Sequence, residues 1–313
     1  MTMSEQAVNT LAAEPATAGQ GTSAKRQLFR LLKEALFFCF LYCGYVQVRD
    51  FLLACLGRSR AVVLYYHRIG EADTLTRSPQ QFREDLAYLR RKYECLNLRE
   101  LSERLSSNKP LRKRLAVVTF DDGYRDNFTT AAPLLNESGI SATFFVSTGF
   151  VGTERKFFHD LRALTEAADD NESTRFPKLT WDDLREMQAM GFEIGSHTVN
   201  HTNMGQSAAA TVEYEITESL KMLQAELGEQ ASAFSFPWGK PEDISDFAVD
   251  VVKQTGYYAA VSAYGGVNSR GENLFRIRRL DVGNGQLSRL AIQARVAGFD
   301  PDFFRLKRKN RKL

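Results

Sequence analysis

Short apolar runs alternate with longer stretches of mixed polarity from residue 61 onward, and this alternation is the main pattern in the chain. The runs AVVLYY, LAVVTF and ATFFVS are apolar at successive positions, as is typical of parallel strands that are covered on both faces. The expected strands are Ala61–Tyr66, Leu115–Phe120, Ala142–Ser147, Phe192–Ser196, Ala233–Phe236, Tyr258–Ser262 and Phe275–Leu280. The expected helices are Pro79–Tyr93, Asn127–Asn136, Trp181–Met190, Ala208–Leu227 and Asp243–Thr255. This rhythm of strand and helix predicts an α/β barrel.

A different pattern occupies the N-terminal part of the chain. Residues 1–24 are rich in Ala, Thr, Ser and Gly and carry only two charged side chains, so they lack apolar area to offset ordering entropy and are expected to be disordered. Basic residues then precede an uncharged run of 14 residues, Ala35–Val48, which is short for a membrane span of about 20 residues. Residues 25–57 are predicted to form an amphipathic helical segment. A position in the membrane interface is favoured over packing on the barrel, and a span or a signal is the third alternative.

The overall charge argues against a nucleic-acid partner. Lys and Arg number 41 and Asp and Glu number 38, which gives a net charge of +3, too even a balance for that class of protein. The last nine residues nevertheless hold six basic side chains and no acidic one. Such a run is usually a solvated tail, but it is also attracted to an anionic membrane surface. Residues 301–313 are therefore assigned to a basic tail, outside a catalytic domain of residues 58–300.

The four cysteines do not indicate a disulfide framework. Cys39, Cys43, Cys55 and Cys95 lie in apolar or helical surroundings without the spacing of a metal or redox motif, so they are expected to be free thiols. The expected location is the cytoplasm or the membrane periphery, and secretion stays open because the N-terminal segment shares features with a signal. The sequence leaves the oligomeric state open.

Polar residues directly follow four of the expected strands. His67 follows the first strand, Asp121 and Asp122 follow the second, His197 follows the fourth, and Pro237-Trp238-Gly239 follows the fifth. Groups at the carboxyl ends of barrel strands converge on one mouth, where the active site of such a barrel lies. The sequence therefore predicts a single polar site built from four separate segments.

Two histidines and two aspartates in this set have the chemistry of a hydrolytic metal centre. His197 and His201 are four residues apart, a spacing that places both imidazoles on one face if the segment makes a helical turn. Two imidazoles and one carboxylate, with a coordination position left open, are typical of hydrolytic zinc sites. Because Asp121 and Asp122 are adjacent, one can bind the metal while the other takes a proton. An H-x-x-x-H pair or an Asp-Asp-Gly turn is common by itself, but together at strand ends they predict a site.

These residues resemble the motifs of the polysaccharide deacetylases, carbohydrate esterase family 4, which share the NodB homology domain. TFDDG at 119–123 is similar to the family's T-F-D-D-G motif, and SHTVNH at 196–201 to its S-H-T-x-x-H motif. Weaker similarities lie at 142–145, 179–182, 236–239 and 276–279, and the resemblance covers residues 60–285. It implies a distorted (β/α)7 barrel of the NodB homology type, here preceded by the amphipathic segment. It also implies a divalent metal cofactor, zinc before cobalt, nickel or manganese.

The resemblance also implies roles for the motif residues. Asp122, His197 and His201 would hold the metal, and Asp121 would be the general base. The family's Arg-x-Pro-Tyr-Gly element supplies an arginine that orients the base, but Ser235 occupies that position here. An orienting cation would have to come from elsewhere, from Arg276 or Arg279, or be absent.

The general acid of the family is a histidine that commonly comes from a late motif, and no histidine follows His201. Tyr65-Tyr66-His67-Arg68 resembles the Y-H-R segment of a subgroup that includes biofilm-exopolysaccharide deacetylases, in which the acid comes from the first strand. His67 is therefore the expected acid, against a structural histidine at the barrel rim. His159 lies in the irregular stretch 148–179 and is expected to be a substrate-side or surface residue.

The expected substrate is an N-acetylated glycan. Trp238 is expected at the barrel rim, either as a platform for a sugar ring or as a cover for the core, and Pro237, Gly239 and Arg279 are the other candidate substrate contacts. The predicted activity is metal-dependent removal of N-acetyl groups from amino sugars of a polysaccharide or oligosaccharide. One alternative is deacetylation or deformylation of a lipid-linked amino sugar, which the N-terminal segment would suit. A noncatalytic sugar-binding protein is disfavoured, since the base and all three metal ligands are present.

Overall fold

The computed structural model describes residues 21–71, 73–161, 176–228 and 232–299. The disorder expected for residues 1–20 and the basic tail 301–313 lie outside the described residues. The expected boundary at residue 25 is not where the first helix starts, because helix α1 begins at Gly21.

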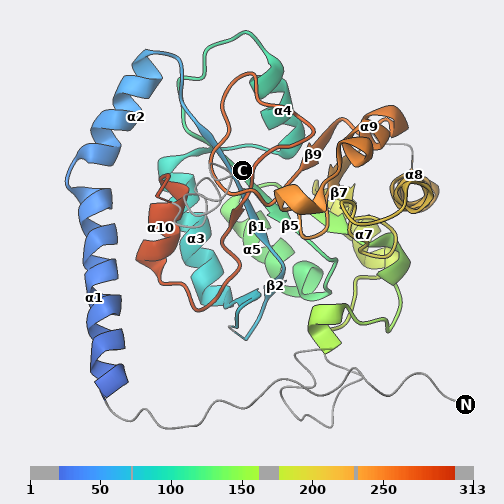
Figure 1. Ribbon diagram of the computed structural model, residues 1–313, viewed down its shortest axis with the longest axis horizontal. Helices are drawn as coiled ribbons and strands as arrows, with labels where there is room; N and C mark the ends of the chain where they lie inside the picture. The colour runs from blue at the N-terminus through green and yellow to red at the C-terminus, as the bar shows by residue number, and fades with distance from the viewer. Residues whose placement is uncertain (1–20, 72, 162–175, 229–231, 300–313) are drawn as a thin grey trace, which may run out of the picture.

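Seven parallel strands form the curved central sheet of a distorted barrel (Figure 1). Their order across the sheet is β10 (Leu280–Asp281), β1 (Ala61–Tyr66), β5 (Leu115–Phe120), β6 (Ala142–Val146), β7 (Glu193–Ser196), β8 (Ala233–Ser235) and β9 (Ala259–Val261). A short strand, β4 (Glu94–Cys95), also pairs with β5, and β2 (Arg68–Ile69) pairs with β3 (Thr76–Arg77) in a separate ribbon. The predicted α/β barrel is therefore confirmed, and β1 and β5 have the predicted bounds.

The seventh strand differs from the prediction. Phe275–Leu280 is not one strand, because Ile277 exchanges hydrogen bonds with β9, donating to Ala260 O at 3.0 Å and accepting from Ser262 N at 2.8 Å. Only Leu280 and Asp281 pair with β1. The segment first bonds with β9 through Ile277 and then pairs with β1 through Leu280 and Asp281. It thereby closes the barrel without a continuous ladder.

Helices cover the outside of the sheet and one end of the barrel. All five predicted helices are present within a few residues, although the second begins with a π turn, η1. The elements are α3 (Pro79–Lys92), α4 (Leu98–Ser106), η1 (Asn127–Ala131), α5 (Ala132–Ser138), η2 (Thr148–Phe150), α7 (Trp181–Ala189), α8 (Ala209–Leu227), η3 (Pro241–Asp243), α9 (Asp246–Thr255) and α10 (Arg289–Val296). Leu98, Leu101 and Leu105 of the unpredicted α4 pack in one cluster with Ala61 and Leu115 at the strand starts. The N-terminal end of the barrel is thus covered by α4, and the site lies at the opposite end.

Two helices run along the outside of the barrel before β1 (Figure 1). Helix α1 (Gly21–Tyr42) and helix α2 (Tyr45–Cys55) are separated by Gly44, whose φ of 92° is left-handed. Phe37, Leu41 and Val46 are buried in one cluster with alanines of α10. The predicted helical segment is therefore packed on the barrel along one side. The four cysteines are free thiols, as expected, and those of α1 and α2 are exposed.

Candidate active site

The polar groups at the strand ends meet in one pocket, as the sequence predicts. The pocket has a volume of about 250 Å³. Its lining includes every residue predicted to be catalytic or metal-binding and adds His159, and the full set is Tyr65, His67, Leu75, Asp121, Asp122, His159, His197, His201, Phe236, Trp238, Ala263 and Arg279. The carboxyl ends of β1, β5, β7 and β8 therefore build one chemical site.

The turn after β5 separates the two aspartates. Asp122 has a φ of 76° and Gly123 a φ of 77°, and a left-handed residue other than glycine costs about 1–3 kcal/mol. A Cβ atom on Gly123 would lie 3.0 Å from Val146 Cγ1, so the position is also crowded. As a result the Asp121 carboxylate contacts Arg279, while the Asp122 carboxylate faces the histidines.

His197 and His201 approach each other through a left-handed loop and not through the helical turn that the spacing suggested. Thr198 and His201 have φ values of 66° and 57°. Buried Glu215 on α8 fixes this loop, because its Oε2 accepts hydrogen bonds from Val199 N at 2.9 Å and Asn200 N at 2.7 Å. Sequence reasoning missed Glu215, since nothing local to a helical glutamate indicates that it binds the backbone of a loop.

Asp122, His197 and His201 form a cluster that fits a divalent metal. Their ligand atoms all lie within 4.8 Å of one another, and the Nε2 atoms of His197 and His201 lie 3.5 and 3.4 Å from Asp122 Oδ1. Both carboxylate oxygens of Asp122 are buried and have no hydrogen-bond partner in the part of the chain that is described. Orphaned buried oxygens beside two imidazoles are a donor set suited to zinc or a similar ion.

The protonation states of the cluster suit cation binding. Burial lowers the pKa of His197 to about 4, so this imidazole is neutral at working pH. Its Nδ1 lies 2.8 Å from Ser235 O, an arrangement that leaves Nε2 available to a metal. Burial by itself raises the pKa of Asp122, but contacts with His159 and His201 hold it well below its ordinary value. Asp122 is therefore anionic, as a carboxylate that binds a cation must be.

Asp121 is held by Arg279, which reaches it from the last strand. Arg279 is 1% exposed, and its Nη1 and Nη2 donate to the two carboxylate oxygens of Asp121 at 2.8 and 2.7 Å. The same Nη2 donates to Ser235 Oγ at 2.9 Å, and Nε donates to Ser262 O at 2.9 Å. Burial raises the pKa of Asp121, but Arg279, followed by His197, holds it below its ordinary value. Asp121 is therefore an ionised and oriented carboxylate, and its role as the general base stays a prediction.

These contacts support the orienting role considered for Arg279, because its buried guanidinium directs N–H groups at Asp121, Ser235 and other groups inside the barrel. Arg279 also lines the pocket, and its contact with substrate stays a prediction. Arg276, the other candidate for orienting the base, instead pairs with Asp246 and donates to Tyr264 Oη at 2.7 Å. Arg279 thus takes the place of the arginine that Ser235 replaces.

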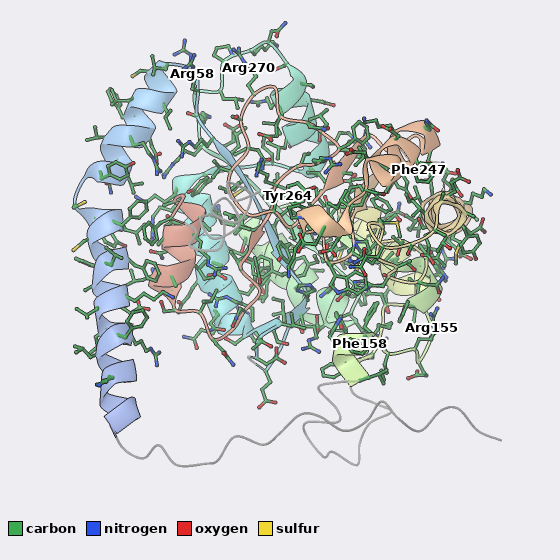
Figure 2. All side chains as sticks on the ribbon, in the orientation of Figure 1. Arg58, Arg155, Phe158, Phe247, Tyr264 and Arg270 are labelled. Atoms are coloured by element: carbon green, nitrogen blue, oxygen red, sulfur yellow. The ribbon has the colours of Figure 1, made fainter. Side chains whose placement is uncertain are left out.

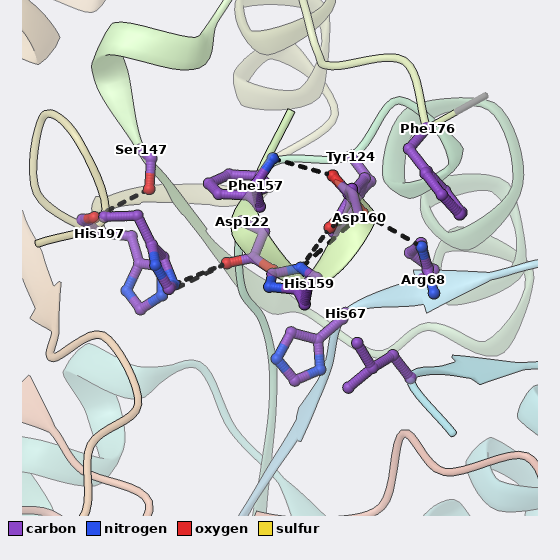
Figure 3. A network of polar contacts seen from close by, with 12 residues as sticks. His67, Arg68, Asp122, Tyr124, Ser147, Phe157, His159, Asp160, Phe176 and His197 are labelled. Atoms are coloured by element: carbon purple, nitrogen blue, oxygen red, sulfur yellow. Dashed lines mark hydrogen bonds and ion pairs between the residues drawn. The ribbon is translucent and has the colours of Figure 1, made fainter. Parts of the chain in front are cut away.

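His67 lies at the end of β1, beside the metal cluster. Figure 3 shows its imidazole next to Asp122 and His159. Its Nδ1 is buried without a hydrogen-bond partner among the described residues, and Asn127 Nδ2 fixes the backbone by donating to His67 O at 2.8 Å. A ring that lines the pocket with a free nitrogen has the placement that proton donation needs. The acid role of His67 stays a prediction.

His159 is not a surface residue, as one expectation had it, but part of the site. Its Nε2 lies 3.4 Å from Asp122 Oδ2 and 2.6 Å from the hydroxyl of Tyr124 (Figure 3). The side chain is 30% exposed. Sequence reasoning placed it in an irregular stretch and had no signal for this contact, because the chain returns to the barrel mouth only in three dimensions.

The turn after β8 presents Trp238 at the pocket. Trp238 is 51% exposed, has a φ of 56° and lies with its ring centroid 4.7 Å from that of His201. Pro237 and Gly239 are buried beneath it and are absent from the pocket lining among the described residues. A Cβ atom on Gly239 would lie 2.8 Å from Ala263 N. These two residues shape the turn, and their contact with substrate stays a prediction.

Comparisons with known proteins agree with this site. Residues 108–260 match the family model for polysaccharide deacetylases. YxkH of Bacillus subtilis (strain 168), whose name places it among the polysaccharide deacetylases, is 25% identical over 224 residues, which is 71% of each chain. The poly-β-1,6-N-acetyl-D-glucosamine N-deacetylase of Staphylococcus aureus is 24% identical over 222 residues, covering 63% of this chain and 69% of that protein.

The fold is also similar to solved structures. The structure of IcaB from Ammonifex degensii superposes with a TM-score of 0.63 at 23% sequence identity, and the match covers 76% of this chain and 97% of that one. At that identity the likeness concerns the fold. It agrees with the curved parallel sheet.

Proposed function

Because the chain belongs to the polysaccharide deacetylase family and is a carbohydrate deacetylase, we propose that it uses one divalent metal ion, zinc first, to remove N-acetyl groups from amino sugars of a polysaccharide or oligosaccharide. The observation that carries the proposal is the pairing of two carboxylates with separate tasks. Asp122 belongs to the Asp122, His197, His201 cluster. The adjacent Asp121 accepts two hydrogen bonds from the Arg279 guanidinium, one on each carboxylate oxygen. This division provides a cation site and a base next to each other.

A divalent ion held by Asp122, His197 and His201 would polarise the amide oxygen and make a water molecule more acidic. The residues around it supply orientation and proton transfer. Asp121 is positioned to take a proton from the attacking water, and Arg279 keeps its carboxylate ionised and fixed. The water oxygen bonds to the amide carbon as the proton passes to Asp121.

The carbon–nitrogen bond then breaks, and the leaving nitrogen needs a proton to depart as an amine. His67 lines the pocket at the end of β1, and its imidazole is not part of the Asp122, His197, His201 cluster. We assign it the transfer of a proton to that nitrogen. The products are acetate and a free amino sugar, which balance the water and the N-acetyl sugar consumed.

The glycan would enter past Trp238. Its half-exposed indole stands over His201 at the pocket mouth, and aromatic rings with one exposed face suit stacking on the apolar face of a sugar. The S. aureus relative is named for a polymer of β-1,6-linked N-acetylglucosamine. We propose the same class of polymer as the first substrate to assay.

The test is release of acetate from N-acetylated glycans by the full chain after metal removal and after metal is returned. Poly-β-1,6-N-acetylglucosamine, chitooligosaccharides and a lipid-linked N-acetylamino sugar form the panel. Metal-dependent release from the first two supports the proposal. Release from the lipid-linked sugar alone would favour the alternative substrate, and release from none, with metal bound, would contradict deacetylation of these glycans.

We also propose that the enzyme works at a membrane surface, through the outer face of α1 and α2. In the part of the chain that the structure describes, twelve of the eighteen exposed large hydrophobic side chains lie between Leu28 and Leu56. Figure 2 shows side chains of both helices extending outward from the barrel. Exposed apolar side chains gathered on two successive helices in this way are typical of an interaction site.

The charges on these helices support a lipid surface as the partner. The two acidic residues of these helices, Glu34 and Asp50, both bind residues of the barrel domain. Glu34 accepts a hydrogen bond from Ser288 Oγ at 2.7 Å, and Asp50 accepts one from Arg114 Nη1 at 2.8 Å. Lys25, Arg30 and Lys33 are exposed. An apolar face bordered by cations suits the interface of an anionic bilayer. Residues 27–55 are apolar and long enough to cross a membrane, but the packing of α1 on α10 favours a helix that lies along the surface.

A further inference from the structure

His159 contacts the side of the Asp122 carboxylate that faces away from the other two histidines. Its Nε2 lies 3.4 Å from Asp122 Oδ2, whereas His197 and His201 approach Oδ1. The cluster of possible ligand atoms within 4.8 Å of one another contains Asp122, His197 and His201 and does not include His159, as far as the described residues extend. His159 therefore touches a metal ligand without joining the ligand set.

The hydrogen bonds around Tyr124 determine which atom of His159 carries a proton. The Tyr124 hydroxyl donates to Asp160 Oδ1 at 2.8 Å and lies 2.6 Å from His159 Nε2. A hydroxyl has one proton, and Tyr124 gives it to Asp160, so its oxygen must accept from His159. Nε2 of His159 is accordingly protonated and directed between the Tyr124 oxygen and Asp122 Oδ2. A protonated nitrogen cannot bind a metal.

Asp160 is fixed as an acceptor by its other neighbours. It is fully buried and accepts from Lys178 Nζ at 3.0 Å, Phe157 N at 3.2 Å and Arg68 Nη1 at 3.4 Å. Two cations therefore donate to this one buried carboxylate, and its oxygens act as acceptors toward them. Because Asp160 acts as the acceptor, Tyr124 donates to Asp160 and His159 donates to Tyr124.

Stacking holds the His159 ring in this orientation. The ring lies parallel to that of Phe157, with centroids 5.4 Å apart and an interplanar angle of 6°. Phe157 in turn stacks on Phe150 at 4.2 Å and 11°. Phe157 and Phe150 are buried, so the stack extends from the core to the site. The ring has little freedom to turn its Nε2 away from Asp122.

We propose that His159 is a positioning residue for the metal centre: its Nε2–H, which the Tyr124 oxygen accepts, also faces Asp122 Oδ2 at 3.4 Å, and this polar contact leaves Oδ1 directed at the ion. This inference rests on the proposed metal role of Asp122. Groups that hydrogen-bond to a ligating carboxylate fix its orientation, and their loss typically weakens metal affinity by about 10–100-fold. The Tyr124–Asp160 pair is the device that keeps His159 in the donating form.

The test is the affinity of the metal-free full chain for Zn²⁺ and Co²⁺, measured by competition with a chromophoric chelator. His159→Ala is expected to weaken binding by about 10–100-fold. His159→Gln, whose amide can still donate, should retain most of the affinity, and Tyr124→Phe should lose part of it. Phe158→Ala is the matched control, since that neighbouring side chain is 78% exposed and is not among the described residues that line the pocket.

Each contrary outcome has a distinct reading. Wild-type affinity in His159→Ala, or in Tyr124→Phe if the alanine variant does not fold, would overturn the proposal. A loss in His159→Ala as complete as that in His201→Ala, with an altered ligand-field spectrum of the Co²⁺ form, would make His159 a direct ligand and overturn it too. If the wild-type chain binds neither ion, the proposed metal function fails first, and this inference fails with it.

Discussion

Arg279 donates a hydrogen bond to Ser235 Oγ at 2.9 Å while the same guanidinium holds both carboxylate oxygens of Asp121. Ser235 stands where the resembling motif carries an arginine that orients the base. The orienting cation therefore comes from Arg279, directly before β10, and not from the residue at the end of β8. Ser235, which is smaller than an arginine, leaves room for the Arg279 guanidinium. The geometry at the base is retained although the motif is altered.

Arg279→Lys should lower kcat by about 10²-fold, because one ammonium cannot hold both oxygens and the base loses its alignment. The acid limb of the pH–rate profile should move to higher pH, since Arg279 lowers the pKa of Asp121 and the base must be ionised. Pre-steady-state and pH-dependent rates on an N-acetylated glycan measure both effects. Arg276→Lys, a change in a nearby arginine outside the site, is the control and should be almost neutral.

Substitution of Arg279 should also lower the free energy of unfolding. Removing the cation in Arg279→Met leaves a buried carboxylate unpaired, which costs about 3–5 kcal/mol. A carboxyl whose pKa is depressed in the fold adds stability above its unfolded pKa, and that stability is lost as the pH falls. The deficit of Arg279→Met should therefore be largest near neutral pH and smaller in acid. Equal deficits at both pH values in urea unfolding would contradict the charge argument.

His197→Ala and His201→Ala should each remove the metal and the activity, because each deletes one of three ligands. The wild-type chain should carry about one divalent ion. Elemental analysis of the purified proteins, together with activity after chelation and after return of zinc, measures this. Full metal occupancy in the double variant would rule out the cluster as the site.

Asp121→Asn should keep the metal and lose turnover by about 10²–10⁴-fold, since the amide preserves shape but cannot take a proton. The contrast with the histidine variants is the informative part, because it separates the two adjacent aspartates. Metal content and kcat are measured on the same preparation. Turnover within about tenfold of wild type, with metal bound, would assign the base to another group.

His67→Ala should lose about 10²–10⁴-fold on an N-acetyl sugar and much less on an aryl acetate, because a phenolate leaves without a proton and an amine does not. Metal affinity should be unchanged, since His67 lies outside the ligand cluster. Equal losses on the two substrates would mean that His67 supports structure, and the acid would have to be sought elsewhere in the pocket.

Leu32→Glu combined with Phe51→Glu should reduce sedimentation of the full chain with vesicles that contain phosphatidylglycerol. Each side chain is exposed on the outer helices, at 61% and 67%, and burial of such a group contributes about 1.5–3 kcal/mol. Tyr214→Glu with Phe247→Glu, also exposed but on α8 and α9, is the matched control. Undiminished vesicle binding by the Leu32→Glu, Phe51→Glu variant would assign membrane binding to the basic residues 301–313 and not to the outer helices.

The sequence by itself determined the parts of this protein that are written in contiguous residues. Apolar runs without alternation fixed β1 and β5 to the residue, because a strand buried on both faces must be apolar throughout. The segments 119–123 and 196–201 located the metal cluster, since each motif follows a strand and strand ends of a barrel converge. The N-terminal helices followed from an uncharged run between basic residues.

Only the tertiary structure decided which distant side chains complete the site. Arg279 and Asp121 are 158 residues apart, and His159 meets Asp122 although η1, α5, β6 and η2 lie between them in the chain. Glu215 holds the loop of His197 and His201 from another helix. Such contacts depend on how far the sheet curves and where loops return, which is set by packing of the whole barrel. Local pattern carries no information on that curvature, so it left open whether Arg276 or Arg279 orients Asp121 and whether His159 lies on the substrate side or at the surface.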